Sequence, residues 1–191
     1  MKLSVEVPLS SFIKVYKEFL PKPLCNEVVE SLQTAEFEKH YFYSASNDSQ
    51  ITHHDDPQVS RDNIPQFETL MVNVWNCIHN YVAKDFDLPY FNCWDGYSNV
   101  RFNKYDVNTK MMIHADHIQS LFEGPRKGIP ILSIVGLLND NFEGGEFVFY
   151  DNDKLDFKQG DIVIFPSNFL YPHRVNPILK GTRYSFVSWV W

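Results

Sequence analysis

Two histidines and an aspartate in the second half of the sequence could together bind a metal ion. His114 and Asp116 lie two residues apart in an apolar, strand-like segment. In a strand their side chains point to the same face, with Cα atoms roughly 6.5–7 Å apart. The third ligand must come from another strand, and His173 follows a later apolar stretch. Two imidazoles and one carboxylate form the facial triad of non-haem Fe(II) centres, which leaves coordination positions open.

The His-x-Asp pattern alone has little specificity, because residues 53–56 (His-His-Asp-Asp) contain it twice. That second cluster lies in a polar stretch, residues 44–63, which we predict to be a long surface loop. We therefore interpret residues 53–56 as solvated, with a contact to the substrate as the alternative.

An arginine ten positions after His173 could bind a carboxylate beside the metal ion. The guanidinium group of Arg183 binds a carboxylate bidentately and keeps its charge. If His173 ends one strand and Arg183 begins the next, both can face one cavity. Ser185 shares the face of Arg183 and can donate a hydroxyl. We expect Trp189 on that face to pack in the core, with lining of the cavity as the alternative. The competing interpretation is a hairpin with an exposed arginine.

The elements that position these residues change in character near residue 96. Two helices are predicted in the first half, one over residues 24–32 and one over residues 64–81, with Asp62 or Ser60 as the N-cap of the second. The chain after Gly96 then predicts short strands, which turn residues separate. These strands cover residues 98–105, 111–117, 131–138, 146–150, 161–165 and 182–190.

Helices followed by many strands predict antiparallel sheets in a sandwich or jelly roll, with the helices bracing one sheet from outside. The length of 191 residues predicts a single domain. Residues 1–95 would form its helical support and residues 96–191 its β core with the metal site. Residues 117–128, which include His117, are the candidate lid or substrate-contact loop, and we expect His117 itself at the surface.

Composition narrows the class of protein and its partners. The net charge of −7 disfavours nucleic acid as a partner, since nucleic-acid binders usually present a basic surface. Cys25, Cys77 and Cys93 show no CxxC spacing, so neither a disulfide framework nor a zinc knuckle is indicated. No apolar run approaches the ~20 residues of a membrane span, and the N-terminus is a poor signal peptide. We expect a soluble, cytoplasmic protein.

Several segments share the spacing of a known family. Tyr105 lies nine residues before His114, and the segments 137–146 and 160–167 lie between the metal-ligand candidates. With His173 and Arg183, these features resemble the 2-oxoglutarate- and Fe(II)-dependent oxygenases, in particular the prolyl 4-hydroxylase-like branch. The resemblance is close over residues 98–191 and looser over the N-terminal helices.

The resemblance implies a mainly β fold, a double-stranded β-helix (a cupin-like jelly roll) supported by N-terminal α-helices. It also implies an Fe(II) ion bound by His114, Asp116 and His173. 2-Oxoglutarate would bind this ion and Arg183, with hydrogen bonds from Tyr105 and Ser185, and O₂ would take the remaining position. The implied reaction hydroxylates a C–H bond, releases succinate and CO₂, and uses ascorbate as reductant. A prolyl residue in a peptide or protein is the expected substrate.

Four alternatives stay open. Asn103 and Tyr105, followed by His-x-Asp, also resemble the AlkB-like oxidative nucleic-acid demethylases, in which the asparagine contacts 2-oxoglutarate, so Asn103 is a further candidate for cofactor binding. The spacing of Arg183 and the absence of arginine from residues 185–191 favour the hydroxylase branch. A hydroxylase of small molecules such as free amino acids is the second alternative. A zinc hydrolase is the third, but it would leave Arg183 without a role. The fourth is a non-enzymatic relative of the fold that has lost iron binding, which the presence of all three candidate ligands and of Arg183 disfavours.

Overall fold

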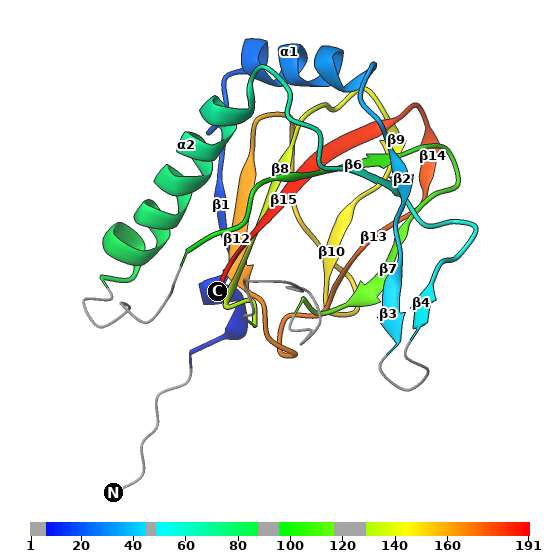
Figure 1. The fold of residues 1–191 in the computed structure, drawn as a ribbon. Helices are drawn as coiled ribbons and strands as arrows, with labels where there is room; N and C mark the ends of the chain where they lie inside the picture. Colours follow the sequence, from blue (N-terminus) through cyan, green and yellow to red (C-terminus); the bar gives the residue numbers. More distant parts are fainter. Residues whose placement is uncertain (1–6, 45–48, 88–95, 117–128) are drawn as a thin grey trace, which may run out of the picture.

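Two antiparallel β-sheets lie face to face in the computed structural model, which describes residues 7–44, 49–87, 96–116 and 129–191 (Figure 1). The larger sheet has the order β1 (Lys14–Tyr16), β12 (Ile162–Pro166), β8 (Leu132–Leu137), β15 (Arg183–Val190), β6 (Arg101–Tyr105), β5 (Gln58–Ser60) and β2 (Glu38–Lys39). The smaller sheet has the order β11 (Asp153–Lys154), β10 (Phe147–Phe149), β13 (His173–Val175) and β7 (Met111–His114). Two short pairs complete the strands: β14 (Ile178–Lys180) with β9 (Glu143–Gly144), and β3 (Phe42–Ser44) with β4 (Ser49–Ile51). This arrangement confirms the predicted double-stranded β-helix.

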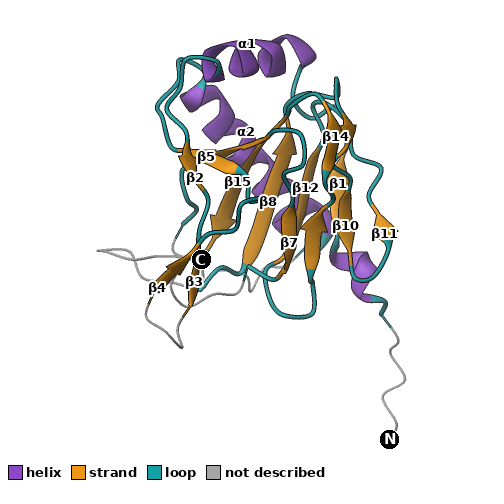
Figure 2. Cartoon of the chain, turned by 90° about the vertical axis from the view of Figure 1, so that its right-hand side faces the viewer, coloured by secondary structure: helices purple, strands orange, loops and turns teal. Residues whose placement is uncertain are grey.

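The helices cover the outer face of the larger sheet (Figures 1 and 2). They are α1 (Lys22–Leu32), α2 (Phe67–His79) and a π-helical turn η2 (Asn80–Asp85) that continues α2. A 3₁₀ turn η1 (Leu9–Phe12) precedes β1, and its Phe12 packs against the cluster between the sheets. Both predicted helices are confirmed. A proline in the first turn of α1 suits its start, because the missing N–H would have no partner within the helix.

The predicted N-cap of α2 is wrong. The helix begins at Phe67 and not near Ile64, and no side chain caps it. Ile64 precedes a proline, which disfavours the helical conformation at that residue. Asp62 instead accepts a hydrogen bond from the backbone N–H of Glu36 at 2.6 Å, and Ser60 accepts one from Asp62 at 3.2 Å.

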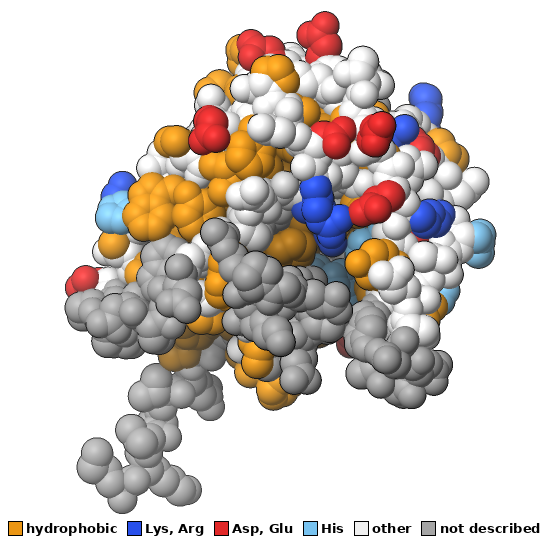
Figure 3. Space-filling model, viewed as in Figure 1, with side chains coloured by type: hydrophobic (Ala, Val, Ile, Leu, Met, Phe, Trp, Pro, Cys, Tyr) orange, Lys and Arg blue, Asp and Glu red, His pale blue; other side chains and the backbone are white. Residues whose placement is uncertain are grey.

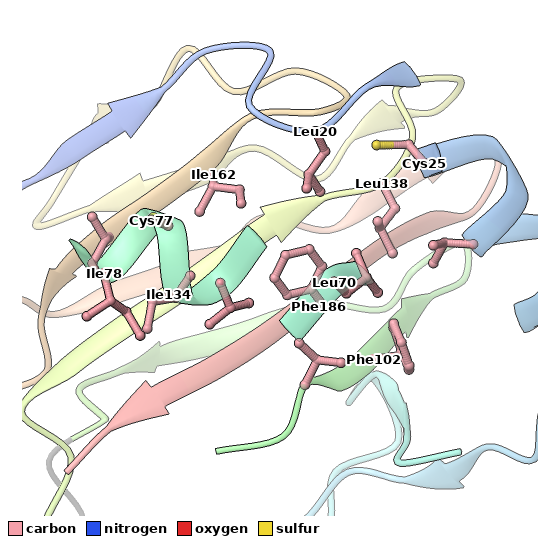
Figure 4. Packing of buried hydrophobic residues seen from close by; sticks show 14 of the residues in the cluster. Leu20, Cys25, Leu70, Cys77, Ile78, Phe102, Ile134, Leu138, Ile162 and Phe186 are labelled. Atoms are coloured by element: carbon pink, nitrogen blue, oxygen red, sulfur yellow. The ribbon is translucent and has the colours of Figure 1, made fainter. Parts of the chain in front are cut away.

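The central strands of the larger sheet are buried on both faces. In β12, Ile162 and Ile164 pack under the helices, whereas Val163 and Phe165 face the smaller sheet. Strand β15 alternates in the same way. Figure 4 shows the layer under the helices, where side chains from α2 and from the sheet point toward one another. Two-sided burial explains why these segments read as nearly continuous apolar runs.

Residues 44–63 are not the long surface loop that their polarity predicts. Strand β5 lies within this stretch and pairs with β6, and Val59 and Ser60 are buried. A three-residue strand with one apolar residue is too short to show a hydrophobic period. The interpretation of residues 53–56 as solvated is correct for both histidines. It is wrong for Asp56, which is buried and accepts a hydrogen bond from the His53 N–H.

The six predicted strands are present, although several are shorter than expected. The strand holding His173 was missed: His173 begins β13 rather than ending a strand, and β14 lies between it and Arg183. These two residues therefore lie on opposite sheets.

The candidate lid, residues 117–128 with His117, lies outside the described residues. Over the described ranges, no helix is long and apolar enough to cross a membrane.

Candidate functional site

The two histidines and the aspartate predicted to bind a metal ion come together between the sheets. His114 ends β7 and lies directly opposite His173 on the neighbouring strand β13. Asp116 follows β7, with its Oδ1 at 3.4 Å from Nε2 of His114 and its Oδ2 at 3.9 Å from Nε2 of His173. All three ligand atoms lie within 4.8 Å of one another.

Backbone carbonyls determine which nitrogen of each imidazole faces this cluster. Nδ1 of His114 lies 2.8 Å from the carbonyl oxygen of Met112, and Nδ1 of His173 lies 3.1 Å from that of Tyr171. A carbonyl oxygen only accepts, so Nδ1 carries the proton in both rings. In the neutral form of each ring, Nε2 then carries a lone pair directed at the cluster, as a metal ligand requires.

Two donors hold the carboxylate of Asp116 in place. The Ser133 hydroxyl donates to Oδ2 at 2.6 Å, and Nε1 of Trp189 donates to the same oxygen at 3.0 Å. Because the single hydroxyl proton of Ser133 is used in this way, Ser133 accepts from the hydroxyl of Ser167 at 2.7 Å. Both donors are on Oδ2, so Oδ1 remains available beside His114.

Charge and burial set the protonation of the cluster. Burial would raise the pKa of Asp116, but the imidazoles of His173 and His114 and the hydroxyl of Ser133 hold that pKa below its usual range. Burial, aided by the neighbouring His114, lowers the pKa of His173 to about 4. Burial also acts to lower the pKa of His114, but its hydrogen bond with Asp116 and the charge of that carboxylate outweigh this effect and raise it. Near neutral pH the cluster therefore holds a carboxylate and an unprotonated His173.

The three residues fit a divalent metal ion. Facial ligands with bonds of about 2.1 Å at right angles lie about 3 Å apart, so small side-chain movements would close this cluster around an ion. The unprotonated nitrogens and the ionised carboxylate are the forms that bind metal.

Arg183 supplies a buried positive charge in the same pocket. Its side chain is 1% exposed, and Nη1 donates to Ser185 at 2.8 Å. Nε and Nη2 are buried and have no hydrogen-bond partner within the described part of the chain. Burial lowers the pKa of this guanidinium, but arginine stays charged at neutral pH. A buried cation without a counter-ion is costly, so the site is built for an anionic ligand.

The other predicted cofactor-binding residues surround this guanidinium. In the register of β15 with β6, Arg183 pairs with Tyr105 and Ser185 pairs with Asn103. The Arg183 guanidinium carbon lies 5.1 Å from the centre of the Tyr105 ring, and Oδ1 of Asn103 is buried without a hydrogen-bond partner in the described residues. All four side chains line one pocket, together with the three candidate metal ligands.

A glycine turn supports the position of Arg183. Gly144 and Gly145 have φ angles of +79° and +64°, a backbone conformation that glycine adopts without strain. A Cβ atom on Gly145 would lie 3.1 Å from Cδ of Arg183 and would press on Ile178. The turn therefore needs glycine both for its backbone conformation and for its contact with the arginine.

Sequence reasoning missed three residues that hold the site. Trp189 packs in the core between the sheets, as expected, and also lines the pocket, but its hydrogen bond to Asp116 was not predicted. Ser133 and Ser167 received no role. A fully buried serine in an apolar strand, as Ser133 is, requires a hydrogen-bond partner, and that signal could have identified it.

Comparisons with known proteins match the family that the sequence resembles. Residues 100–191 match the profile described as the 2OG-Fe(II) oxygenase superfamily. A PKHD-type hydroxylase of Idiomarina loihiensis is 38% identical over 96 residues, and one of Delftia acidovorans is 32% identical over 97 residues. These matches cover 49% and 47% of this chain but only 42% and 41% of those proteins, so the chain spans less than half of each.

Solved structures with the same fold include two prolyl hydroxylases. One, from Trichoplax adhaerens in complex with a hypoxia-inducible-factor peptide fragment, has a TM-score of 0.72 at 18% identity and covers 95% of this chain and 84% of that one. A prolyl-4-hydroxylase of Pseudomonas putida has a TM-score of 0.66 at 16% identity and covers 94% of this chain and 91% of that one. At these identities the likeness concerns the fold.

Proposed function

We propose that this chain is an Fe(II)- and 2-oxoglutarate-dependent hydroxylase of the prolyl hydroxylase-like branch, because residues 100–191 match the profile of the 2OG-Fe(II) oxygenase superfamily and its relatives include PKHD-type hydroxylases. The proposed reaction inserts one oxygen atom into a C–H bond and converts 2-oxoglutarate into succinate and CO₂. The proposed substrate is a prolyl residue in a peptide or protein, because the relatives are PKHD-type hydroxylases and the similar structures are prolyl hydroxylases.

One observation carries the proposal: a two-histidine, one-carboxylate cluster shares a pocket with a buried guanidinium that has no carboxylate partner among the described residues. The cluster accounts for the metal ion, and Arg183 accounts for a dicarboxylic co-substrate that reaches from the metal to a second anchor. Neither feature alone distinguishes an oxygenase from other metalloenzymes.

The metal-ligand candidates and Arg183 have separate roles in this proposal. His114, Asp116 and His173 would hold Fe(II), which together with 2-oxoglutarate supplies the activation of O₂. Arg183 would bind the distal carboxylate of 2-oxoglutarate bidentately. The main task of the protein is then to position the reactants and exclude water.

Further contacts would complete both ends of the site. Ser185, Tyr105 and Asn103 would contact the co-substrate, since they line the pocket around Arg183. Ser133 and Trp189 would keep Oδ1 of Asp116 directed at the metal ion.

The pocket disfavours a zinc hydrolase. Apart from the three candidate ligands, its described lining contains no histidine or carboxylate that could act as a general base. The hydrolase would also leave the Arg183 charge buried without a counter-ion.

The test is release of succinate by the purified chain given Fe(II), 2-oxoglutarate and ascorbate. The substrate panel holds proline-containing peptides, free amino acids and methylated oligonucleotides, with mass spectrometry to detect a product one oxygen atom heavier. We expect succinate with a peptide substrate, loss of it in His114→Ala and His173→Ala, and full activity in His54→Ala, which removes a histidine whose side chain is 97% exposed. Full activity in either ligand variant would refute the proposal.

A further inference from the structure

A second arginine, Arg101, lines the same pocket, and the proposed co-substrate does not account for it. Three of the four arginines within the described residues have hydrogen-bond acceptors: Arg61 donates to Glu38, Arg174 to the carbonyls of Tyr150 and Asp151, and Arg183 to Ser185. Arg101 donates to no acceptor in that part of the chain, and its Nε is buried and unpartnered. Its one described contact is with the Trp189 ring, whose centre lies 5.0 Å from the guanidinium carbon.

Strand geometry places Arg101 at the other end of the pocket from Arg183. Arg101, Asn103 and Tyr105 alternate along β6 and face the pocket together, while Phe102 faces the helices. Arg101 pairs with Val187, four residues from the Arg183–Tyr105 pair. Four residues of strand span roughly 13 Å, so the two guanidinium groups serve different parts of the site.

Arg101 is also close to the proposed metal ion. The Trp189 ring beneath its guanidinium donates to Asp116 at 3.0 Å, so a single side chain separates the charge from the metal cluster. Trp189 holds the guanidinium by a cation–π contact and leaves its N–H groups available to a ligand.

The surroundings of Arg101 do not neutralise its charge. Burial, together with the nearby Arg61, lowers the pKa of Arg101 to about 10, although Tyr105 and Asp116 act in the opposite direction. The group therefore stays charged at neutral pH. Asp116 is the only carboxylate among the groups that shift the pKa of Arg101, and it is directed at the metal cluster. Figure 3 shows Lys and Arg side chains next to Asp and Glu side chains over β2 and β6 on this face, in a chain whose net charge is −7.

The loaded site would carry an excess positive charge. The divalent ion and the two arginines exceed the charges of Asp116 and the 2-oxoglutarate dianion by one. A substrate with one negative group beside the reacting C–H bond would balance this excess. A single, half-buried guanidinium suits a carboxylate, and the acidic chain disfavours a nucleic-acid polyanion.

We propose that Arg101 binds a carboxylate of the substrate and so selects acidic substrates, a conclusion that rests on the proposed function. The carboxylate could be the α-carboxylate of a free amino acid, or an aspartate or glutamate side chain next to the target residue of a peptide. In both cases Arg101 anchors the substrate at the open end of the pocket while Arg183 anchors the co-substrate.

The direct test measures binding, without turnover. The chain is loaded with redox-inert Zn(II) and 2-oxoglutarate, and then titrated with acetate, with N-acetyl-L-proline and with its neutral amide, by tryptophan fluorescence and ligand-observed NMR. We expect saturable binding of both carboxylates, and binding of the amide weaker by at least about tenfold. Arg101→Gln should abolish this preference and leave 2-oxoglutarate binding unchanged, and Arg101→Lys should retain part of it. Arg61→Gln, which removes an exposed guanidinium already paired with Glu38, should behave like the native chain.

The outcomes separate this inference from the proposed function. If Zn(II) and 2-oxoglutarate fail to bind the native chain, both are overturned. If they bind but acetate does not, or if Arg101→Gln keeps the preference for carboxylates, this inference alone is overturned. A large loss of 2-oxoglutarate affinity in Arg101→Gln would also overturn it, because Arg101 would then belong to the co-substrate site.

Turnover then identifies the source of the carboxylate. Succinate release is compared between L-proline and L-prolinamide, between peptides with glutamate or glutamine beside proline, and with a methylated oligonucleotide. Stimulation by L-proline over its amide indicates a free amino acid, and stimulation by the glutamate peptide over its partner indicates an acidic peptide. Equal stimulation within both pairs, or stimulation by the oligonucleotide alone, contradicts selection by Arg101.

Discussion

Replacing Ser133 with alanine tests whether the hydrogen bonds around Asp116 prepare the site for metal. The Ser133 hydroxyl donates to Oδ2 of Asp116 at 2.6 Å, and Ser133 is fully buried, so water cannot take its place. Without this donor the carboxylate is free to turn away from the position in which Oδ1 faces the metal cluster. We expect this loss of orientation to outweigh the gain in basicity of the carboxylate.

The magnitude follows from the geometry. A hydrogen bond to a charged group contributes about 1.5–3 kcal/mol, and ~1.4 kcal/mol corresponds to tenfold in affinity. Ser133→Ala should therefore weaken metal binding by about 10- to 100-fold, the range known for residues that orient metal ligands. Trp189→Phe removes the longer of the two hydrogen bonds to the same oxygen and should cost less. The double variant should show coupling, because both donors bind one atom.

The assay is anaerobic calorimetric titration with Fe(II), or with Mn(II) as a stable substitute. Ser188→Ala is the matched control, since it also removes a fully buried serine hydroxyl with a hydrogen bond, here to the Ser98 carbonyl. Both variants should lower the free energy of unfolding, but only Ser133→Ala should lower metal affinity. Equal affinity in Ser133→Ala and the native chain, or equal losses in both variants, would refute the reasoning.

Three further predictions concern other parts of the structure. Arg183→Ala should raise the half-saturating concentration of 2-oxoglutarate by the equivalent of roughly 2–5 kcal/mol, and an unchanged value in a succinate assay would count against its role. Gly136→Ala should lower the free energy of unfolding by about 1–3 kcal/mol in urea titration, because its Cβ would overlap the Phe186 ring; a native-like midpoint would contradict the packing. Burial is the main cause that lowers the pKa of His173 to about 4 and that of His40 to about 3. The unfolded chain therefore binds more protons than the folded chain. For each of the two histidines, the free energy of unfolding of the metal-free protein should fall by up to ~1.4 kcal/mol per pH unit as the pH drops from about 6.5 toward these values. Thermal unfolding that does not change with pH would contradict this prediction.

The sequence predicts the grouping of the candidate site well because local rules determine much of it. A strand places every second side chain on one face, and this rule brought His114 and Asp116 together and placed Ser185 beside Arg183. Asp116 in fact lies just after the end of β7, but its carboxylate still lies beside the His114 ring, as the rule predicts. That these residues bind metal and co-substrate stays a prediction until ligands are measured.

The remaining features depend on contacts between distant segments, which a sequence pattern does not show. The donors to Asp116 come from β8 and β15 of the opposite sheet, so their role arises only when the sheets pack together. Strand β5 forms because it pairs with β6, and its own sequence shows no hydrophobic period. No sequence motif marks Arg101 as a binding residue. Its buried Nε without a hydrogen-bond partner in the described structure is the feature that indicates a role.

The most direct test of the central claim is a crystal structure of the chain with Mn(II) and N-oxalylglycine, a stable analogue of 2-oxoglutarate. We predict one ion bound by Nε2 of His114, Oδ1 of Asp116 and Nε2 of His173, with the distal carboxylate of the analogue on the guanidinium of Arg183. An ion bound elsewhere, or a carboxylate held by Arg101 in place of Arg183, would contradict this assignment of the site.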